Sequence, residues 1–304
     1  MKIAIVGGLG FIGTNLYYEL NNQHDVIILD NFTTKKNLKF LKTAKIYRVD
    51  LLEEKKLIKL TKGVECIINL AAQTGVLESN VFPEKSIKLN ILGTLNILKC
   101  CKFNKIKHFI NASTAGAIYG NTGIANELTD KNPISFYGLT KKFAEDQIAL
   151  FLENIKTKNT NLRFSNVYGG YSFHKTSLIH NSIKNLLKNK KQLIFGSGYQ
   201  MRDFIYVKDL TKIIKNICEK KVYGTYNIAS GSSYNVKKII KSLIQIDNRF
   251  KFKHIQKKVG EVDKVKIDNS KIIKKLRMKK NDFTDIKIAI NETFIWYKKH
   301  FKLN

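Results

Sequence analysis

The sequence predicts an α/β protein: a doubly wound parallel sheet followed by a smaller C-terminal α/β lobe. Short apolar runs alternate with amphipathic stretches through the first half of the chain, which is the pattern of successive βαβ units. A glycine-rich turn at residues 7–13 joins the first apolar run to the first amphipathic stretch. With 304 residues, the chain is long enough for one large domain that carries such a lobe.

The first half supplies the strands of the expected sheet and the helices that cover it. The expected strands are Lys2–Val6, Val26–Asp30, Lys45–Val49, Cys66–Leu70, His108–Ala112 and Asn161–Phe164. The expected helices are Phe11–Asn22, Glu53–Thr61, Glu84–Lys102 and Tyr137–Ile155. Because a helix or a turn follows each strand, neighbouring strands should run parallel, with helices on both faces.

The second half is less regular in its patterning. We expect helices at Ser177–Lys188, Lys208–Glu219 and Val236–Ile246, strands at Gln192–Phe195, Asp203–Val207 and Thr225–Ile228, and amphipathic segments at Asn269–Leu276 and Ile286–His300. The chain has no repeat, no low-complexity linker and only two prolines, so its two parts should be closely joined. We place the sheet domain at residues 1–168, completed by about 208–229, and the lobe at residues 169–304.

The formal net charge of +30 raises the question of an acidic or nucleic-acid partner. Arginine occurs only at positions 48, 163, 202, 249 and 277, so lysine carries almost all of the positive charge. Nucleic-acid sites favour the arginine fork for phosphates and base edges, whereas these lysines are spread along the chain among asparagine and isoleucine. A compositional bias of the source genome explains this pattern more simply than nucleic-acid binding does.

Cysteine usage and the N-terminal segment favour a cytoplasmic protein. The four cysteines show no CxxC spacing, so we expect reduced thiols and no metal site. No apolar run approaches the length of a membrane span, and Met1–Val6 leads into the glycine turn without a small-residue cleavage site. We therefore expect a soluble protein without a signal peptide.

The glycine turn has the form of a dinucleotide-binding loop. Gly7, Gly10 and Gly13 give a GxxGxxG spacing between a strand and a helix. Such a turn needs positive φ, close approach of the backbone to a pyrophosphate, and tight packing of the helix on the sheet. Phe11 and Ile12 open the helix, whose N-terminal N–H groups and positive dipole end suit phosphates. Flavin and other nucleotide sites use similar loops, so the turn alone leaves the ligand open.

Asp30 narrows the choice of dinucleotide. It ends the second expected strand, twenty residues after Gly10, where a carboxylate accepts hydrogen bonds from the adenosine ribose hydroxyls. The same negative charge repels a 2′-phosphate, which favours NAD over NADP. Lys35 and Lys36 follow closely and would soften that preference.

A tyrosine and a lysine supply groups for acid–base chemistry. Tyr137 and Lys141 lie four residues apart at the start of an expected helix, so their side chains share one face. Beside an ammonium group and a positively charged nicotinamide, the phenol should lose its proton more easily. Tyr137 can then take a proton from an alcohol as hydride leaves for the cofactor.

The same YxxxK spacing occurs at two other places. These are Tyr171/Lys175 and Tyr234/Lys238. Position favours the pair at 137 and 141, which alone comes just after the strand His108–Ala112. Ser113 and Thr114 stand at the end of that strand, on the carboxyl edge where ligands bind in a doubly wound sheet.

Together these residues resemble the extended short-chain dehydrogenases/reductases, specifically the NAD-dependent nucleotide-sugar epimerase/dehydratase family and its UDP-glucose 4-epimerase-like members. The resemblance covers nearly the whole chain. Its segments are, in order, Gly7–Gly13, Leu29–Asn31, Asp50–Leu51, Asn69–Gln73, Asn90–Thr94, Ser113–Gly120, Tyr137–Lys141, Leu162–Gly169, Arg202–Val207 and Asp209–Leu210. The resemblance implies a Rossmann domain for NAD and a C-terminal lobe for a nucleotide sugar.

The resemblance also implies which residues surround the cofactor. It adds Asn31 to Asp30 and places Asp50 and Leu51 near the adenine. Further along the chain, Leu70, Ala71 and Ala72 would lie beside the cofactor, and Lys141 would hold the nicotinamide ribose.

The substrate contacts follow from the same resemblance. Ser113 and Thr114 would hydrogen-bond the reacting sugar hydroxyl, with Thr114 favoured, although the family commonly keeps a hydroxyl where this chain has Ala115. The implied substrate-binding residues are Asn166 and Arg202 on the diphosphate, Phe204 near the nucleobase, and Lys258 as a further phosphate contact. Lys258 replaces an arginine of the family pattern, which keeps the charge but loses the planar fork. Family members are often homodimers through the helices expected here at Glu84–Lys102 and Tyr137–Ile155.

The two residues after Thr114 limit which reactions of the family this chain can be expected to catalyse. Dehydratases of the family carry an Asp-Glu pair there, whereas this chain has Ala115-Gly116, which disfavours dehydration. The simplest remaining chemistry is C4 epimerisation of a nucleotide-linked hexose, of the UDP-glucose/UDP-galactose type, through a transient 4-keto sugar. A 4-keto reductase, or an epimerase for another base or an N-acetyl sugar, stays open. In a different class, the scaffold could serve a non-catalytic RNA- or cofactor-binding protein, but the retained tyrosine, lysine and hydroxyl favour an enzyme.

Overall fold

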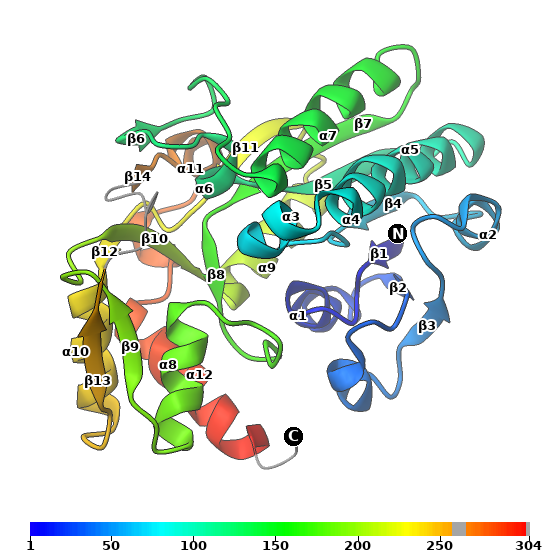
Figure 1. Cartoon of the computed structure of the whole chain (residues 1–304). Helices are drawn as coiled ribbons and strands as arrows, with labels where there is room; N and C mark the ends of the chain where they lie inside the picture. The colour runs from blue at the N-terminus through cyan, green and yellow to red at the C-terminus, as the bar shows by residue number, and fades with distance from the viewer. Residues whose placement is uncertain (257–265, 302–304) are drawn as a thin grey trace.

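A parallel sheet of seven strands forms the centre of the molecule in the computed structural model, which describes residues 1–256 and 266–301 (Figure 1). Its strands are β1 (Lys2–Val6), β2 (Asp25–Asp30), β3 (Lys45–Arg48), β4 (Cys66–Asn69), β5 (His108–Thr114), β7 (Lys158–Phe164) and β11 (Gly224–Ile228). They lie in the order β11-β7-β5-β4-β1-β2-β3, and every neighbouring pair is parallel. The connections run outward in opposite directions from β1 and β4, which confirms the doubly wound prediction and puts a crevice at their carboxyl ends.

Helices cover both faces of the sheet. On one face lie α1 (Phe11–Leu20), α9 (Val207–Glu219) and α11 (Ser270–Leu276); on the other lie α2 (Glu54–Leu60), α5 (Gly93–Phe103) and α7 (Phe136–Leu152). Side-chain alternation within β1 explains the two layers. Ile3 and Ile5 are buried against the first set of helices, and Ala4 and Val6 against the second.

The helix predicted at Glu84–Lys102 forms as a continuous helical run that changes its winding part-way. The run follows α3 (Val76–Val81) and consists of α4 (Pro83–Ile87), a π-helical turn at Lys88–Leu92, and α5. Asn90 within this turn exchanges two hydrogen bonds with the backbone of Gln73, at 2.9 and 3.1 Å, and donates to Thr140 Oγ1 at 3.0 Å. The π turn therefore ties α7 to the loop that follows β4.

The C-terminal lobe is built from short strands and three amphipathic helices, in the lower left of Figure 1. Its elements are β8 (Asn166–Tyr168), α8 (Leu178–Leu187), β9 (Gln192–Phe195), β10 (Met201–Tyr206), β12 (Ser233–Asn235), α10 (Val236–Ile246), β13 (Phe252–Ile255) and α12 (Ile286–His300). The strands form a three-stranded sheet, β12-β10-β8, and a parallel pair, β9-β13. Apolar side chains of α8, α10 and α12 fill the lobe's own core.

Several short elements complete the part of the chain that the structure describes. They are α6 (Ala115–Ile118), β6 (Ile124–Ala125), β14 (Lys266–Ile267) and the 3₁₀ turns Lys35–Phe40 and Lys280–Asp282. β6 pairs with β14, so a segment near the end of the chain lies against the loop that follows β5. None of the helices in the described ranges combines the length and apolar composition that crossing a bilayer requires.

Candidate active site

The glycine turn between β1 and α1 has the geometry that its spacing predicts. Gly7 has φ +79°, and a Cβ there would lie 2.8 Å from the backbone nitrogen of Ala71. A Cβ on Gly13 would lie 2.5 Å from the carbonyl oxygen of Gly7. Gly8, which the spacing argument passed over, is equally constrained, because a Cβ there would lie 2.6 Å from Ile28 Cγ2. These positions require glycine because the backbone turns and packs tightly there.

Asp30 lies at the carboxyl end of β2, beside this turn. Its Oδ2 accepts a hydrogen bond from the backbone N–H of Leu9 at 3.0 Å, and its Oδ1 accepts one from Phe32 at 2.8 Å. Burial raises the pKa of Asp30, while these two backbone donors act in the opposite direction. Each carboxylate oxygen has a second lone pair, so the side chain can still accept hydrogen bonds from two hydroxyl groups.

The predicted adenine-side residues form a small polar cluster next to Asp30. Asn31 Nδ2 donates to Asp50 Oδ2 at 2.9 Å, and both residues line a surface hollow together with Arg48. Leu51 contributes differently, because its side chain is buried and a Cβ on Gly93 would lie 2.8 Å from it. Asn31 and Asp50 thus offer polar groups at the surface, whereas Leu51 packs beneath them.

The catalytic candidates come together where α7 crosses the end of β5. Ser135 caps α7 by accepting a hydrogen bond from the backbone N–H of Gly138, so Tyr137 lies in the first turn. Its phenol is hydrogen-bonded to the side chain of Thr114, the last residue of β5. One helical turn on, Lys141 is buried and its Nζ donates to the carbonyl oxygen of Ala112 at 2.8 Å. Tyr137, Lys141 and Thr114 therefore share one corner of the sheet edge.

Burial has the largest effect on the pKa of Tyr137. Burial raises the pKa of Tyr137 to about 12, and only the hydrogen bond with Thr114 acts to lower it. Lys141 directs an N–H at Ala112 rather than acidifying the phenol, and burial lowers its own pKa to about 8. Lys141 is thus not among the groups that lower the pKa of Tyr137 here, and the expected joint effect of the ammonium group and the nicotinamide stays a prediction.

Ser113 also differs from the prediction. Its hydroxyl donates to Glu145 Oε1 at 2.6 Å, inside the protein, and not toward Tyr137. Both β5 side chains reach α7, but Ser113 meets Glu145, two helical turns beyond Tyr137, whereas Thr114 meets Tyr137 itself. The predicted contact of Ser113 with a sugar hydroxyl is therefore withdrawn, and Thr114 alone keeps that assignment.

The predicted substrate residues that the structure describes lie on two neighbouring strands of the lobe, the edge strand β8 and the central strand β10. Asn166 is exposed on β8, and its Nδ2 donates to the carbonyl oxygen of Asp203 on β10 at 2.8 Å. Arg202 is half-buried on β10 and donates to the carbonyl oxygen of Met201 at 2.9 Å. Phe204 is buried in the lobe core against Tyr168, so its contact with a nucleobase stays a prediction. Lys258 lies outside the described residues.

Neither alternative YxxxK pair lies at this sheet edge. Tyr171 has φ +60° and packs against Trp296 and Phe40, with ring centroids 5.1 Å apart in each case. Tyr234 lies on β12, where Lys238 stands 4.6 Å from the centre of its ring. Both tyrosines are held in contacts away from β5.

Comparison with known proteins decides the family. A family model described as the NAD dependent epimerase/dehydratase family matches residues 3–229. The chain belongs to that family. Its members' cofactor is NAD, and the fold and the nucleotide-sugar chemistry implied by the motifs agree with this assignment.

Several proteins similar to this chain are described as nucleotide-sugar epimerases. A putative UDP-glucose 4-epimerase of Methanocaldococcus jannaschii is 33% identical, over 98% of this chain and 99% of that protein. The UDP-glucose 4-epimerase of Thermotoga maritima, solved with UDP-glucose, has a TM-score of 0.92 and 28% identity, covering 99% of this chain and 100% of that one. A UDP-glucuronic acid 4-epimerase of Bacillus cereus, solved with UDP-glucuronic acid and NAD, has a TM-score of 0.91 and 27% identity, covering 98% and 99%. The chain is thus an NAD-dependent enzyme of the nucleotide-sugar epimerase/dehydratase type.

The structure provides the groups that NAD needs. Among the described residues, a Cβ on Gly10 would have a single neighbour within 4 Å, the carbonyl oxygen of Gly7 at 3.1 Å, so that side of the turn is open. The first-turn amides of α1, from Phe11 to Gly13, have no acceptor within the helix and suit a pyrophosphate. Asp30 offers acceptors for ribose hydroxyls, and Lys141 has N–H donors beyond the one bound to Ala112.

Sequence reasoning missed several residues that shape this site. Gly138 lets α7 approach α6, because a Cβ there would lie 2.2 Å from the carbonyl oxygen of Ala117. Ser79 on α3 accepts the backbone N–H of Tyr137 at 3.0 Å. Glu145 and Arg163 form a buried ion pair next to Ser113. The spacing of Tyr137, Lys141 and Glu145 by four residues is the one signal in the sequence that could have identified this last group.

Proposed function

We propose that this chain catalyses NAD-dependent epimerisation at C4 of a nucleotide-linked hexose, of the UDP-glucose/UDP-galactose type. The observation that carries the proposal is the meeting of Tyr137, Thr114 and Lys141 at the carboxyl end of β5. The reaction would pass through a 4-keto sugar that turns within the pocket before it is reduced on its other face.

Each of these side chains has a defined task in the proposal. NAD, when bound, supplies the hydride acceptor and a positive charge beside the phenol. Tyr137 takes the proton from the sugar 4-hydroxyl and later returns it. Thr114, in hydrogen-bond contact with the phenol, orients the reacting hydroxyl. Lys141, held by Ala112, binds the nicotinamide ribose through its remaining N–H donors.

The two residues after Thr114 support this reaction type. Ala115 is fully buried in an apolar cluster with Ile118 and Tyr119, and Gly116 has no side chain. Neither position supplies the acid that elimination of water needs. A 4-keto reductase uses the same tyrosine and lysine and is the second candidate. It differs by consuming one reduced cofactor for every turnover.

In this proposal the two parts of the chain divide the work. Residues 1–168, completed by about 208–229, hold NAD, and residues 169–304 hold the nucleotide sugar. Asn166 on β8 and Arg202 on β10 would bind the diphosphate, Arg202 through charge-assisted bonds. Firm phosphate contacts beside a loosely held hexose would allow the keto sugar to turn.

The test is incubation of the purified enzyme with UDP-glucose, with products read by NMR. Formation of UDP-galactose without added NADH supports the epimerase. Activity that needs stoichiometric reduced cofactor would replace the epimerase with the reductase. Salt-dependent RNA binding without turnover of UDP-, TDP-, CDP- or GDP-sugars would favour the non-catalytic alternative.

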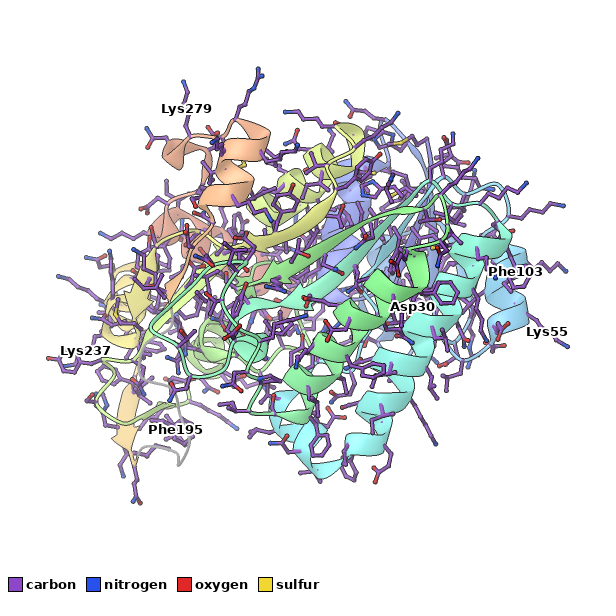
Figure 2. The ribbon with its side chains drawn as sticks, turned by 90° about the horizontal axis from the view of Figure 1, so that it is seen from above. Asp30, Lys55, Phe103, Phe195, Lys237 and Lys279 are labelled. Carbon is purple, nitrogen blue, oxygen red and sulfur yellow. The ribbon has the colours of Figure 1, made fainter. Side chains whose placement is uncertain are left out.

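We also propose that the enzyme is a homodimer through α5 and α7. These helices lie side by side across the sheet in Figure 2, with Phe103 labelled at the end of α5. Their exposed apolar side chains include Phe103, Leu139, Phe143 and Leu150, and Leu92 is exposed in the π-helical turn just before α5. A second copy of this chain would bury them. Leu150→Glu should convert a dimer to a monomer by light scattering, whereas Ile288→Glu, at an exposed isoleucine of α12, should not.

A further inference from the structure

Three successive residues of β5 are tied to three successive turns of α7. Thr114 is hydrogen-bonded to Tyr137, the carbonyl oxygen of Ala112 accepts from Lys141, and Ser113 donates to Glu145. The α7 residues lie four apart, on one face of the helix. The first two contacts belong to the proposed active site, and the third continues the row away from it.

Glu145 is buried and accepts three hydrogen bonds from neighbouring side chains. Its side chain is 4% exposed, and its two oxygens accept from Arg163 Nε at 3.0 Å and from Arg163 Nη2 at 2.6 Å. Ser113 Oγ adds a third hydrogen bond at 2.6 Å. The carboxylate therefore has a fixed position and orientation one helical turn from Lys141.

Arg163 is itself fixed from the other side. It lies on β7 between Ser113 of β5 and Asn227 of β11 in the strand register. Its Nη1 donates to the hydroxyl of Tyr119 at 2.7 Å, and that hydroxyl donates to Asn227 Oδ1 at 2.7 Å. The network thus spans three strands beneath the site.

A buried ion pair is weak evidence for stability, because desolvation of both charges offsets much of their attraction. A role in the site gives this pair another reason to exist. Glu145 is the charged group that raises the pKa of Lys141 against the larger, lowering effect of burial. Without a carboxylate at this position, the lysine would be neutral over more of the physiological pH range.

One further charged group reaches Glu145, and others around α7 are exposed. Lys131, in the loop before α7, lies 3.7 Å from Glu145 and pairs with Asp146 on the surface. On the helices packed against α7, the charged side chains Glu78, Glu84, Lys85 and Lys88 are exposed. Glu145 is therefore the buried carboxylate that faces the Lys141 side of the helix.

We propose that Glu145, clamped by Arg163 and Ser113, is a positioning residue that keeps Lys141 charged and oriented for its work on the nicotinamide ribose. The role assigned to Lys141 rests on the proposed function, whereas the contacts of Glu145 do not.

The decisive experiment is an NMR titration of Lys141 in the intact enzyme labelled with ¹³C-lysine. The Lys141 resonance is assigned by its loss in Lys141→Met. Glu145→Gln, which keeps the hydrogen bond from Ser113 but removes the charge, should lower the titration midpoint by about one pH unit. Asp146→Asn removes an exposed carboxylate from the next residue and should leave the midpoint within about 0.3 units. Equal midpoints in wild type and Glu145→Gln would overturn the proposal.

A double variant covers the case in which Glu145→Gln unfolds because Arg163 is left unpaired. Glu145→Gln/Arg163→Met removes both buried charges and should fold, with a downward shift of the Lys141 midpoint that is smaller than in Glu145→Gln, because the opposing charge of Arg163 is removed as well. An unchanged midpoint in this variant would also overturn the proposal. In turnover assays, kcat of Glu145→Gln should fall about fivefold at pH 8 and stay near wild type at pH 6.5. The titration needs no substrate, so an enzyme that epimerises nothing would refute the proposed function and leave this result standing.

Discussion

The two parts of the molecule build their binding surfaces in different ways. The sheet domain fixes its groups through backbone: parallel strands end at one edge, and glycines stand where an added Cβ would lie within 3 Å of neighbouring atoms. The lobe holds Asn166 and Arg202 on strands of three and six residues, around an aromatic-rich core of its own. The difference indicates that the chemistry depends on a rigid frame, whereas substrate choice depends on short strands and loops that can vary.

Tyr137→Phe should produce the largest effect, because it removes the proton acceptor while keeping the ring. We expect kcat to fall about 10²–10⁴-fold, with NAD affinity and melting temperature close to wild type. Conversion of UDP-glucose measured by NMR checks this. Tyr234→Phe, at the alternative YxxxK pair on the lobe, is the matched control and should keep most activity. Near-normal turnover of Tyr137→Phe would remove this residue from the base role.

Gly7→Ala tests the glycine turn between β1 and α1. The new Cβ would lie 2.8 Å from the Ala71 nitrogen at φ +79°, so the turn must shift. We expect a loss of about 1–3 kcal/mol in stability and a fall of at least tenfold in NAD affinity, measured by thermal unfolding and calorimetry. Gly123→Ala is the control, since a Cβ there meets nothing within 4 Å among the described residues. Equal NAD affinity in the two variants would contradict a pyrophosphate site at this turn.

Arg202→Gln tests the lobe. Loss of charge-assisted hydrogen bonds to a diphosphate should raise KM for the sugar nucleotide about 10–100-fold, because each is worth about 1.5–3 kcal/mol. NAD affinity should not change. Lys237→Gln, whose side chain projects from α10 at the outer side of the lobe in Figure 2, should leave KM unaltered. A parallel loss of NAD binding in Arg202→Gln would show that the two parts do not divide the work as proposed.

Asp30→Asn should have the smallest effect. The amide keeps one acceptor for ribose but removes the charge, so NAD affinity should fall about tenfold or less and discrimination against NADP should relax. Burial raises the pKa of Asp30, so on acidification wild-type affinity should decline at a higher pH than for an ordinary aspartate. Asp30→Asn should lack this decline, whereas Asp25→Asn, at the exposed start of the same strand, should retain it. An unaltered cofactor preference by calorimetry would exclude the ribose contact.

Sequence patterns predicted the frame better than the details of the site. The predicted bounds of β9, α10 and α12 agree with the structure to the residue. The strands β6, β8, β12 and β14 have two or three residues each, too few for periodicity to reveal, and the four-residue strand β13 was also not predicted.

The error at Ser113 has a related cause. The strand was predicted to end at Ala112, and the partner of Ser113, Glu145, lies on another element, so the chain alone did not show where this hydroxyl is directed. The clamp of Arg163 on Glu145 was not visible either, because it joins residues of different elements through the packing of α7 on the sheet. Side-chain direction at a strand end is thus the information that the chain alone lacked.

The central claim is that hydride leaves C4 of the sugar and returns to the same carbon within one site. UDP-glucose deuterated at C4, incubated with the NAD-loaded enzyme in ordinary water, tests it directly. If NAD carries the hydride as proposed, the UDP-galactose formed should retain deuterium at C4, because the label never reaches solvent. UDP-galactose that has exchanged this deuterium for hydrogen would contradict it.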